Sequence, residues 1–101
     1  MSYYISGKIT DVNREKELAN MQLFYDAEER LLKEGYKDIF NPAKLEKDGF
    51  TWEQYLARDL YYIFENKPTI LLLPNWHESR GARLEVETAK LLGLEIREIK
   101  S

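Results

Sequence analysis

The chain has 101 residues, of which 44% are hydrophobic, and a formal net charge of −3. This length suits one domain, and the mixed charges provide no positive field for binding a nucleic acid polymer. The absence of cysteine excludes disulfides and thiolate zinc sites. The longest uninterrupted apolar run, Ile70 to Leu73, is too short to cross a bilayer, and the N-terminus lacks a signal-peptide pattern. We therefore expect a cytoplasmic protein with a small-molecule partner and no membrane partner.

The first part of the chain predicts a strand, a helix and a second strand. Tyr3 to Ser6 is a β-rich run, and Asp11 or Asn13 is placed to cap the helix that follows. Apolar residues recur at helical spacing from Arg14 to Glu34, and Lys37 to Phe40 is the second predicted strand. The apolar positions of this helix are Leu18, Met21, Phe24, Tyr25, Leu31 and Leu32.

The middle of the chain predicts a loop and a second helix. The segment from Ala43 to Phe50 is polar and contains the turn pair Asp48-Gly49, so we expect a loop over a site. Thr51 and Gln54 have the spacing of a capping box, which predicts a helix starting here and ending near residue 66.

The last part predicts a buried strand, a loop, a third helix and an edge strand. Thr69 to Leu73 is the apolar strand, and Pro74 to Arg80 is the loop that follows it. The third helix spans roughly Gly81 to Leu92, and Glu95 to Ile99 alternates polar and apolar residues.

This alternation of strands and helices predicts an α/β fold of the Rossmann or flavodoxin type. We expect a single three-layer domain over residues 1–101, with a four- or five-stranded, mainly parallel sheet and helices on both faces. Ligands of such sheets bind at the C-terminal ends of the strands. Gly7, Asn41 and the loop from Pro74 to Arg80 lie at that end.

Asp59 differs from the acidic residues that alternate with Lys and Arg on solvated helix faces. It lies in the middle of the apolar face of the second helix, where burying an unpaired carboxylate is costly. It therefore either forms a structural pair with an arginine or has a functional role, and the pattern leaves both open.

Glu85 lies about one turn inside the third helix, on a face with small side chains. Small neighbours let a ligand approach closely and leave the carboxylate at the floor of a cleft. Glu87, in contrast, has basic helical neighbours and resembles an ordinary surface residue. A structural ion pair of Glu85 with Arg80 or Arg83 is the competing interpretation.

Two carboxylates from different helices suit displacement at an anomeric carbon, where one attacks and the other manages a proton. This chemistry requires no metal, and lone His77 has no neighbours at metal-ligand spacing, so we expect no metal and no cofactor. The start of the third helix favours a phosphate. Trp76 in the preceding loop, or Trp52 and Tyr55, is placed to stack on a nucleobase.

Three segments carry a family resemblance over nearly the whole chain. They are Tyr4-Ile5-Ser6-Gly7, Arg58-Asp59-Leu60 and Ser79-Arg80-Gly81-Ala82-Arg83-Leu84-Glu85. Together they resemble the nucleoside 2-deoxyribosyltransferase-like superfamily, most closely its small branch found in phages and bacteria. That superfamily includes deoxyribosyltransferases, which exchange bases on deoxyribose, and 2′-deoxynucleoside 5′-monophosphate N-glycosidases, which hydrolyse the same bond.

The resemblance implies a role for each matching residue. Glu85 would be the nucleophile that attacks C1′ of deoxyribose, Asp59 would help the base to leave, and Tyr4 would orient the nucleophile. A serine at Ser79 is similar to the nucleotide hydrolases, in which it contacts the 5′-phosphate, whereas the transferases tend to carry an aspartate. The residues that would complete the phosphate and sugar pocket are Gly7, Gly81 and, as counter-charges, Lys8 or Arg80.

The sequence departs from the family pattern at two places. The first loop of the nucleotide hydrolases resembles Gly-Ser-Ile-Arg-Gly, whereas here it reads Gly7-Lys8-Ile9-Thr10-Asp11, so Lys8 is the residue that must replace the arginine. Glu87 stands where a glycine usually lies.

We therefore expect an N-glycosidase that releases the free base from 2′-deoxynucleoside 5′-monophosphates through a covalent deoxyribosyl–Glu85 intermediate. The alternatives are a nucleoside 2-deoxyribosyltransferase and a non-catalytic nucleotide-binding protein. A homodimer or a higher homo-oligomer is the expected assembly.

Overall fold

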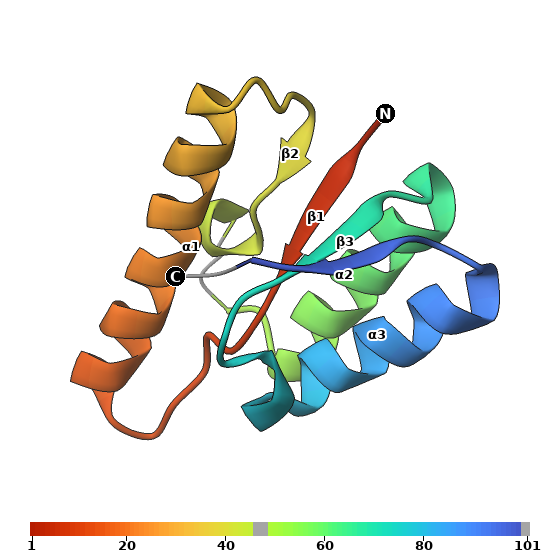
Figure 1. The fold of residues 1–101 in the computed structure, drawn as a ribbon. Helices are drawn as coiled ribbons and strands as arrows, with labels where there is room; N and C mark the ends of the chain where they lie inside the picture. Colours follow the sequence, from red (N-terminus) through yellow and green to blue (C-terminus); the bar gives the residue numbers. More distant parts are fainter. Residues whose placement is uncertain (46–48, 100–101) are drawn as a thin grey trace.

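A parallel sheet forms the centre of the computed structural model, which describes residues 1–45 and 49–99 (Figure 1). Its strands are β1 (Tyr3–Ser6), β2 (Ile39–Phe40), β3 (Thr69–Leu72) and β4 (Ile96–Glu98). They lie in the order β2-β1-β3-β4, and all three neighbouring pairs are parallel. The α/β fold with a mainly parallel sheet is confirmed, and the sheet has four strands.

Helices cover both faces of this sheet. The helices are α1 (Arg14–Lys33), α2 (Trp52–Asn66) and α3 (Arg80–Leu92), and two short 3₁₀ helices are η1 (Pro42–Leu45) and η2 (Trp76–Glu78). Helix α1 packs on one face, while α2 and α3 lie together on the other (Figure 1). No helix in the described ranges is both long and apolar enough to span a bilayer.

The alternation of side chains along the strands divides the hydrophobic core in two. Ile5 and Leu71 belong to the cluster under α1, whereas Tyr4, Ile70 and Leu72 belong to the cluster under α2 and α3. Every residue of β3 is buried, as expected of a central strand covered on both faces.

Side-chain caps fix where the helices begin. Asn13, rather than Asp11, caps α1, and Thr51 forms the predicted capping box with Gln54. Ser79 caps α3 by accepting a hydrogen bond of 3.1 Å from a main-chain N–H one turn later, so this helix begins one residue earlier than predicted.

Fewer apolar side chains of α1 are buried than the helical periodicity of the sequence predicted. Leu18, Tyr25 and Leu32 are exposed, because a helix lying against one face of a sheet buries only positions three or four residues apart along one line. The buried positions are Met21, Phe24, Ala27 and Leu31.

Two segments between the helices differ from the sequence prediction. The second strand starts at Ile39, because Asp38 has a positive φ of 55°, which interrupts an extended strand. Part of the predicted loop forms the turn η1, whereas Asp48 of the predicted turn pair lies outside the described residues.

Gly7, directly after β1, is required by a close approach of two chain segments. A Cβ atom added at Gly7 would lie 2.9 Å from Cβ of Leu73 and 3.0 Å from Oδ1 of Asn75. Contacts this short force neighbouring atoms to move. At Gly81 the nearest atoms to an added Cβ are 3.8 Å away, which is ordinary packing.

We expect Gly7→Ala to destabilise the protein by about 1–3 kcal/mol, the usual range for overpacking. Gly81→Ala is the matched control; it should be neutral or slightly stabilising, because alanine has the higher helix propensity. Thermal and urea unfolding followed by circular dichroism would measure both. A Gly7→Ala variant as stable as the wild type would contradict the steric argument.

Candidate active site

A cavity of about 410 Å³ opens at the C-terminal ends of the strands, where ligands bind in parallel α/β sheets. Its walls come from residues 7–10 after β1, from the first two turns of α2, and from residues 78–82 and Glu85 around the start of α3. Because α2 and α3 pack side by side on one face of the sheet, they bring Asp59 and Glu85 to the same cavity.

The Glu85 carboxyl group is buried and held by two hydroxyl groups from β1. Tyr4 donates a hydrogen bond of 2.8 Å to Oε2, and Ser6 donates one of 2.7 Å to Oε1. Tyr4 and Ser6 are two residues apart on a strand, so both side chains point to the face that α3 covers. Each carboxyl oxygen therefore has its own donor, which fixes the plane of the group.

Burial raises the pKa of Glu85 from its ordinary value of 4.5 to about 8. The hydrogen bond from Ser6 opposes this rise because it stabilises the ionised form, and the hydroxyl of Tyr4 acts in the same direction. The nearby negative charge of Asp59 raises the pKa further. Burial also raises the pKa of Tyr4, so this hydroxyl keeps its proton and remains a donor.

Asp59 is buried beside its sequence neighbour, Arg58. Oδ1 of Asp59 accepts hydrogen bonds from Nε and Nη2 of Arg58 at 3.1 and 2.9 Å. Burial raises the pKa of Asp59, and the arginine opposes that rise. Both interpretations of Asp59 left open by the sequence thus have support, since it forms an arginine pair and also lines the cavity.

Glu85, in contrast, forms no ion pair with Arg80 or Arg83 in the described chain; its partners are the two hydroxyl groups. Arg80 instead lies over the ring of Trp52, with its Cζ 4.7 Å from the ring centroid. The competing ion-pair interpretation therefore loses its support.

The start of α3 supplies the side of the cavity that favours an anion. Ser79, Arg80 and Gly81 all line the cavity, next to the positive end of the helix dipole. The Ser79 oxygen accepts the capping hydrogen bond from the N–H of Ala82, and its hydroxyl proton remains available to a ligand.

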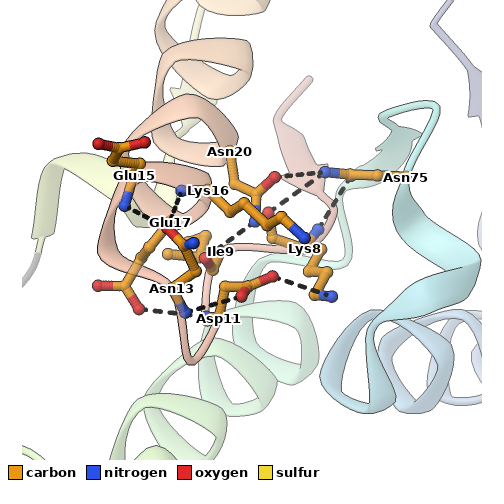
Figure 2. A network of polar contacts seen from close by, with 9 residues as sticks. All are labelled: Lys8, Ile9, Asp11, Asn13, Glu15, Lys16, Glu17, Asn20 and Asn75. Carbon is orange, nitrogen blue, oxygen red and sulfur yellow. Dashed lines mark hydrogen bonds and ion pairs between the residues drawn. The ribbon is translucent and has the colours of Figure 1, made fainter.

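Lys8, in the loop after β1, also lines the cavity, and its ammonium group already forms an ion pair. Its ammonium group lies 3.5 Å from a carboxylate oxygen of Asp11 in the same loop (Figure 2). Glu17 of α1 also lines the cavity and accepts a hydrogen bond from the N–H of Asp11. This wall therefore carries both signs of charge.

Of the aromatic residues that the sequence offered for stacking on a nucleobase, one lies away from the cavity and two line it. Trp76 packs against the core cluster that contains Tyr4, and it is outside the residues that line the cavity. Trp52 and Tyr55 line the cavity instead. His77 is exposed. In the parts of the chain that the structure describes, no three His, Cys, Asp or Glu side chains gather as a metal site would need.

Sequence reasoning assigned no role to Ser6 or Arg58, although both belong to the segments that carry the resemblance. One signal for Ser6 was present, because residues i and i+2 of a strand share a face and Tyr4 was already assigned to Glu85. Arg58 gave no such signal, since adjacent residues on a helix do not ordinarily face each other.

The raised pKa of Glu85 predicts that the free energy of unfolding falls as the pH rises from about 4.5 to about 8. In this interval the folded protein retains a proton that the unfolded chain has lost, so a rise in pH favours unfolding, by at most about 1.4 kcal/mol per pH unit. Glu85→Gln should remove much of this dependence. Urea unfolding at pH 5 and pH 8 would test it.

Glu87→Gln on the exposed face of the same helix is the matched control and should keep the wild-type dependence. If Glu85→Gln lost stability with pH as steeply as the wild type, Glu85 would not carry the raised pKa.

Comparison with known proteins gives a family but no activity. The profile of DUF4406, a domain of unknown function, matches residues 1–98. A search of curated proteins finds no match. The matched range includes all four strands, all three helices and every residue of the cavity described above. The chain therefore belongs to the DUF4406 family.

Proposed function

We propose that this protein hydrolyses the N-glycosidic bond of 2′-deoxynucleoside 5′-monophosphates and releases the free base. One observation carries the proposal: two buried carboxyl groups, Glu85 and Asp59, reach one cavity from different helices and have different partners. The resemblance of the sequence to the deoxyribosyltransferase-like superfamily supports the same roles for these residues.

In this mechanism the ionised carboxylate of Glu85 attacks C1′ while the bond from C1′ to the base nitrogen breaks. The electron pair of that bond leaves with the base, which takes a proton from Asp59 or from water. Water then attacks C1′ of the deoxyribosyl ester, the bond from C1′ to the Glu85 oxygen breaks, and the proton of the water passes to Asp59, or to the hydroxide that remains where water protonated the base. Deoxyribose 5-phosphate is released and both carboxyl groups return to their starting states.

The hydrogen bonds of the two acids support this division of labour in part, while burial raises the pKa of Glu85 to about 8 and leaves only a fraction of this group ionised at neutral pH. Tyr4 and Ser6 stabilise the ionised form of Glu85 that must attack, and they hold its plane fixed. Burial raises the pKa of Asp59, which helps this group to retain the proton that the departing base needs.

The remaining cavity residues fit the ends of a nucleotide. Ser79 and Gly81 at the start of α3, with Arg80 or Lys8 as counter-charge, are assigned to the phosphate. We assign the base to Trp52 and Tyr55 because both line the cavity, whereas Trp76 does not.

Two other functions use the same cavity. A deoxyribosyltransferase would have the same first step, and a second base would then replace water as the acceptor. A non-catalytic nucleotide-binding protein is favoured by the raised pKa of Glu85, which keeps much of this group protonated at neutral pH.

We expect the wild type to release free base from at least one of the four 2′-deoxynucleoside 5′-monophosphates. Glu85→Gln should reduce the rate at least about 1,000-fold, because the nucleophile is lost. Asp59→Asn should reduce it about 100-fold or more, because proton transfer is lost. Chromatography of the free base would measure both rates.

Glu87→Gln is the control for Glu85→Gln and should retain the wild-type rate. No release by the wild type, or unchanged release by Glu85→Gln, would overturn the proposal. Tight binding of a deoxynucleotide without turnover would favour the non-catalytic alternative, and base exchange in the presence of a second free base would favour the transferase.

We also infer that the protein is a cytoplasmic homodimer. Large apolar side chains are exposed on the helices α2 and α3, where a second copy would cover them; they are Tyr61, Phe64, Leu84 and Leu91. Light scattering should give twice the monomer mass of 12.0 kDa. A mass of one monomer at all concentrations tested would exclude the dimer.

A further inference from the structure

The carboxamide of Asn75 joins two loops that are far apart in the sequence. Asn75 follows β3, and its Oδ1 accepts a hydrogen bond of 3.1 Å from the main-chain N–H of Lys8, which follows β1. Its Nδ2 donates to the main-chain carbonyl of Lys8 at 3.4 Å. One side chain thus pairs with both main-chain groups of a single residue, as a neighbouring antiparallel strand would.

A second amide extends this connection to α1 (Figure 2). Nδ2 of Asn75 lies 3.4 Å from Oδ1 of Asn20, and Nδ2 of Asn20 donates to the carbonyl of Ile9 at 3.2 Å. The main chain of Lys8 and Ile9 is therefore held from two sides, by a loop at the end of the sheet and by a helix.

The position of this contact explains why a side chain is needed there. Main-chain pairing of β1 with β3 reaches its end at the hydrogen bond of 2.8 Å from the Leu73 N–H to the Ser6 carbonyl. Beyond it, Gly7 has no Cβ, and an added one would come within 3.0 Å of Oδ1 of Asn75. Glycine at position 7 thus lets the carboxamide approach the chain where strand pairing stops.

Residues 7–10 form one wall of the cavity, whereas Asn75 is outside the residues that line it. The Asn75 carboxamide, which contacts Lys8, can therefore affect a ligand through this wall. The wall includes Lys8, whose ammonium group is one of the cations that face the cavity.

We propose that Asn75 is a positioning residue, whose carboxamide continues the pairing of β1 beyond Ser6 and holds residues 7–10 in place for ligand binding. The effect of Asn75 on substrate binding rests on the proposed function of the cavity. The effect of Asn75 on the order of residues 7–10 is independent of that function.

Hydrogen exchange tests the loop without any substrate. In Asn75→Ala we expect the Lys8 amide to exchange about 10-fold faster than in the wild type, the factor that corresponds to one lost hydrogen bond. Asn20→Ala should increase exchange in the same loop by a smaller factor, because it removes the outer amide only. Asn66→Ala, which loses an exposed side-chain bond to the carbonyl of Tyr62, is the control and should leave Lys8 unchanged.

Asn75→Asp keeps the shape of the side chain and the acceptor for the Lys8 N–H but loses the donor. Exchange of the Lys8 amide in this variant should lie closer to the wild type than in Asn75→Ala. NMR of the labelled protein resolves the individual amides. Equal exchange of Lys8 in Asn75→Ala and the wild type would overturn the proposal.

Steady-state kinetics with 2′-deoxynucleoside 5′-monophosphates test the consequence for binding. We expect the KM of Asn75→Ala to rise about 5- to 10-fold, with kcat within about twofold of the wild type, because a contact outside the cavity is lost while the carboxyl groups stay in place. A fall in kcat with an unchanged KM would overturn the positioning role. Absence of activity in the wild type would overturn the proposed function, and hydrogen exchange would still decide the role of Asn75.

Discussion

The site depends on one buried carboxyl group, that of Glu85, and on the two hydroxyl groups that hold it. Tyr4 and Ser6 come from β1, and Glu85 comes from α3, so these hydrogen bonds also join the sheet to the helix above it. Burial favours the neutral acid, whereas the two donors favour the carboxylate. The balance places the pKa near 8, where the group changes charge close to physiological pH.

Asp59 lines the same cavity but has a different environment. An adjacent guanidinium group compensates its charge, and Arg58 in turn packs over the rings of Tyr55 and Phe40, with its Cζ 5.3 and 5.8 Å from their centroids. One acid is thus held by neutral donors and the other by a cation. Burial raises the pKa of both acids, so their unlike partners are what distinguishes the two groups.

The basic side chains that line the cavity already form ion pairs or ring contacts within the protein. Lys8 pairs with Asp11, Arg58 pairs with Asp59, and Arg80 stacks on Trp52. A ligand anion must therefore compete with, or add to, contacts that already exist. Among the described residues, the backbone N–H groups at the start of α3 form no hydrogen bond with a carboxylate. This helix end therefore favours the binding of a negative group.

The sequence by itself determined the order of strands and helices along the chain, the capping box at Thr51, and the unusual positions of Asp59 and Glu85, because periodicity and capping are local properties of the chain. Only the tertiary structure decided the partners of these acids. The contacts of Glu85 with β1 span about 80 residues and depend on which strand lies under α3, and the contact of Asn75 with Lys8 depends on where strand pairing stops. Likewise, Trp76 of η2 packs against the core while Trp52 lines the cavity, and no local pattern distinguishes the two tryptophans.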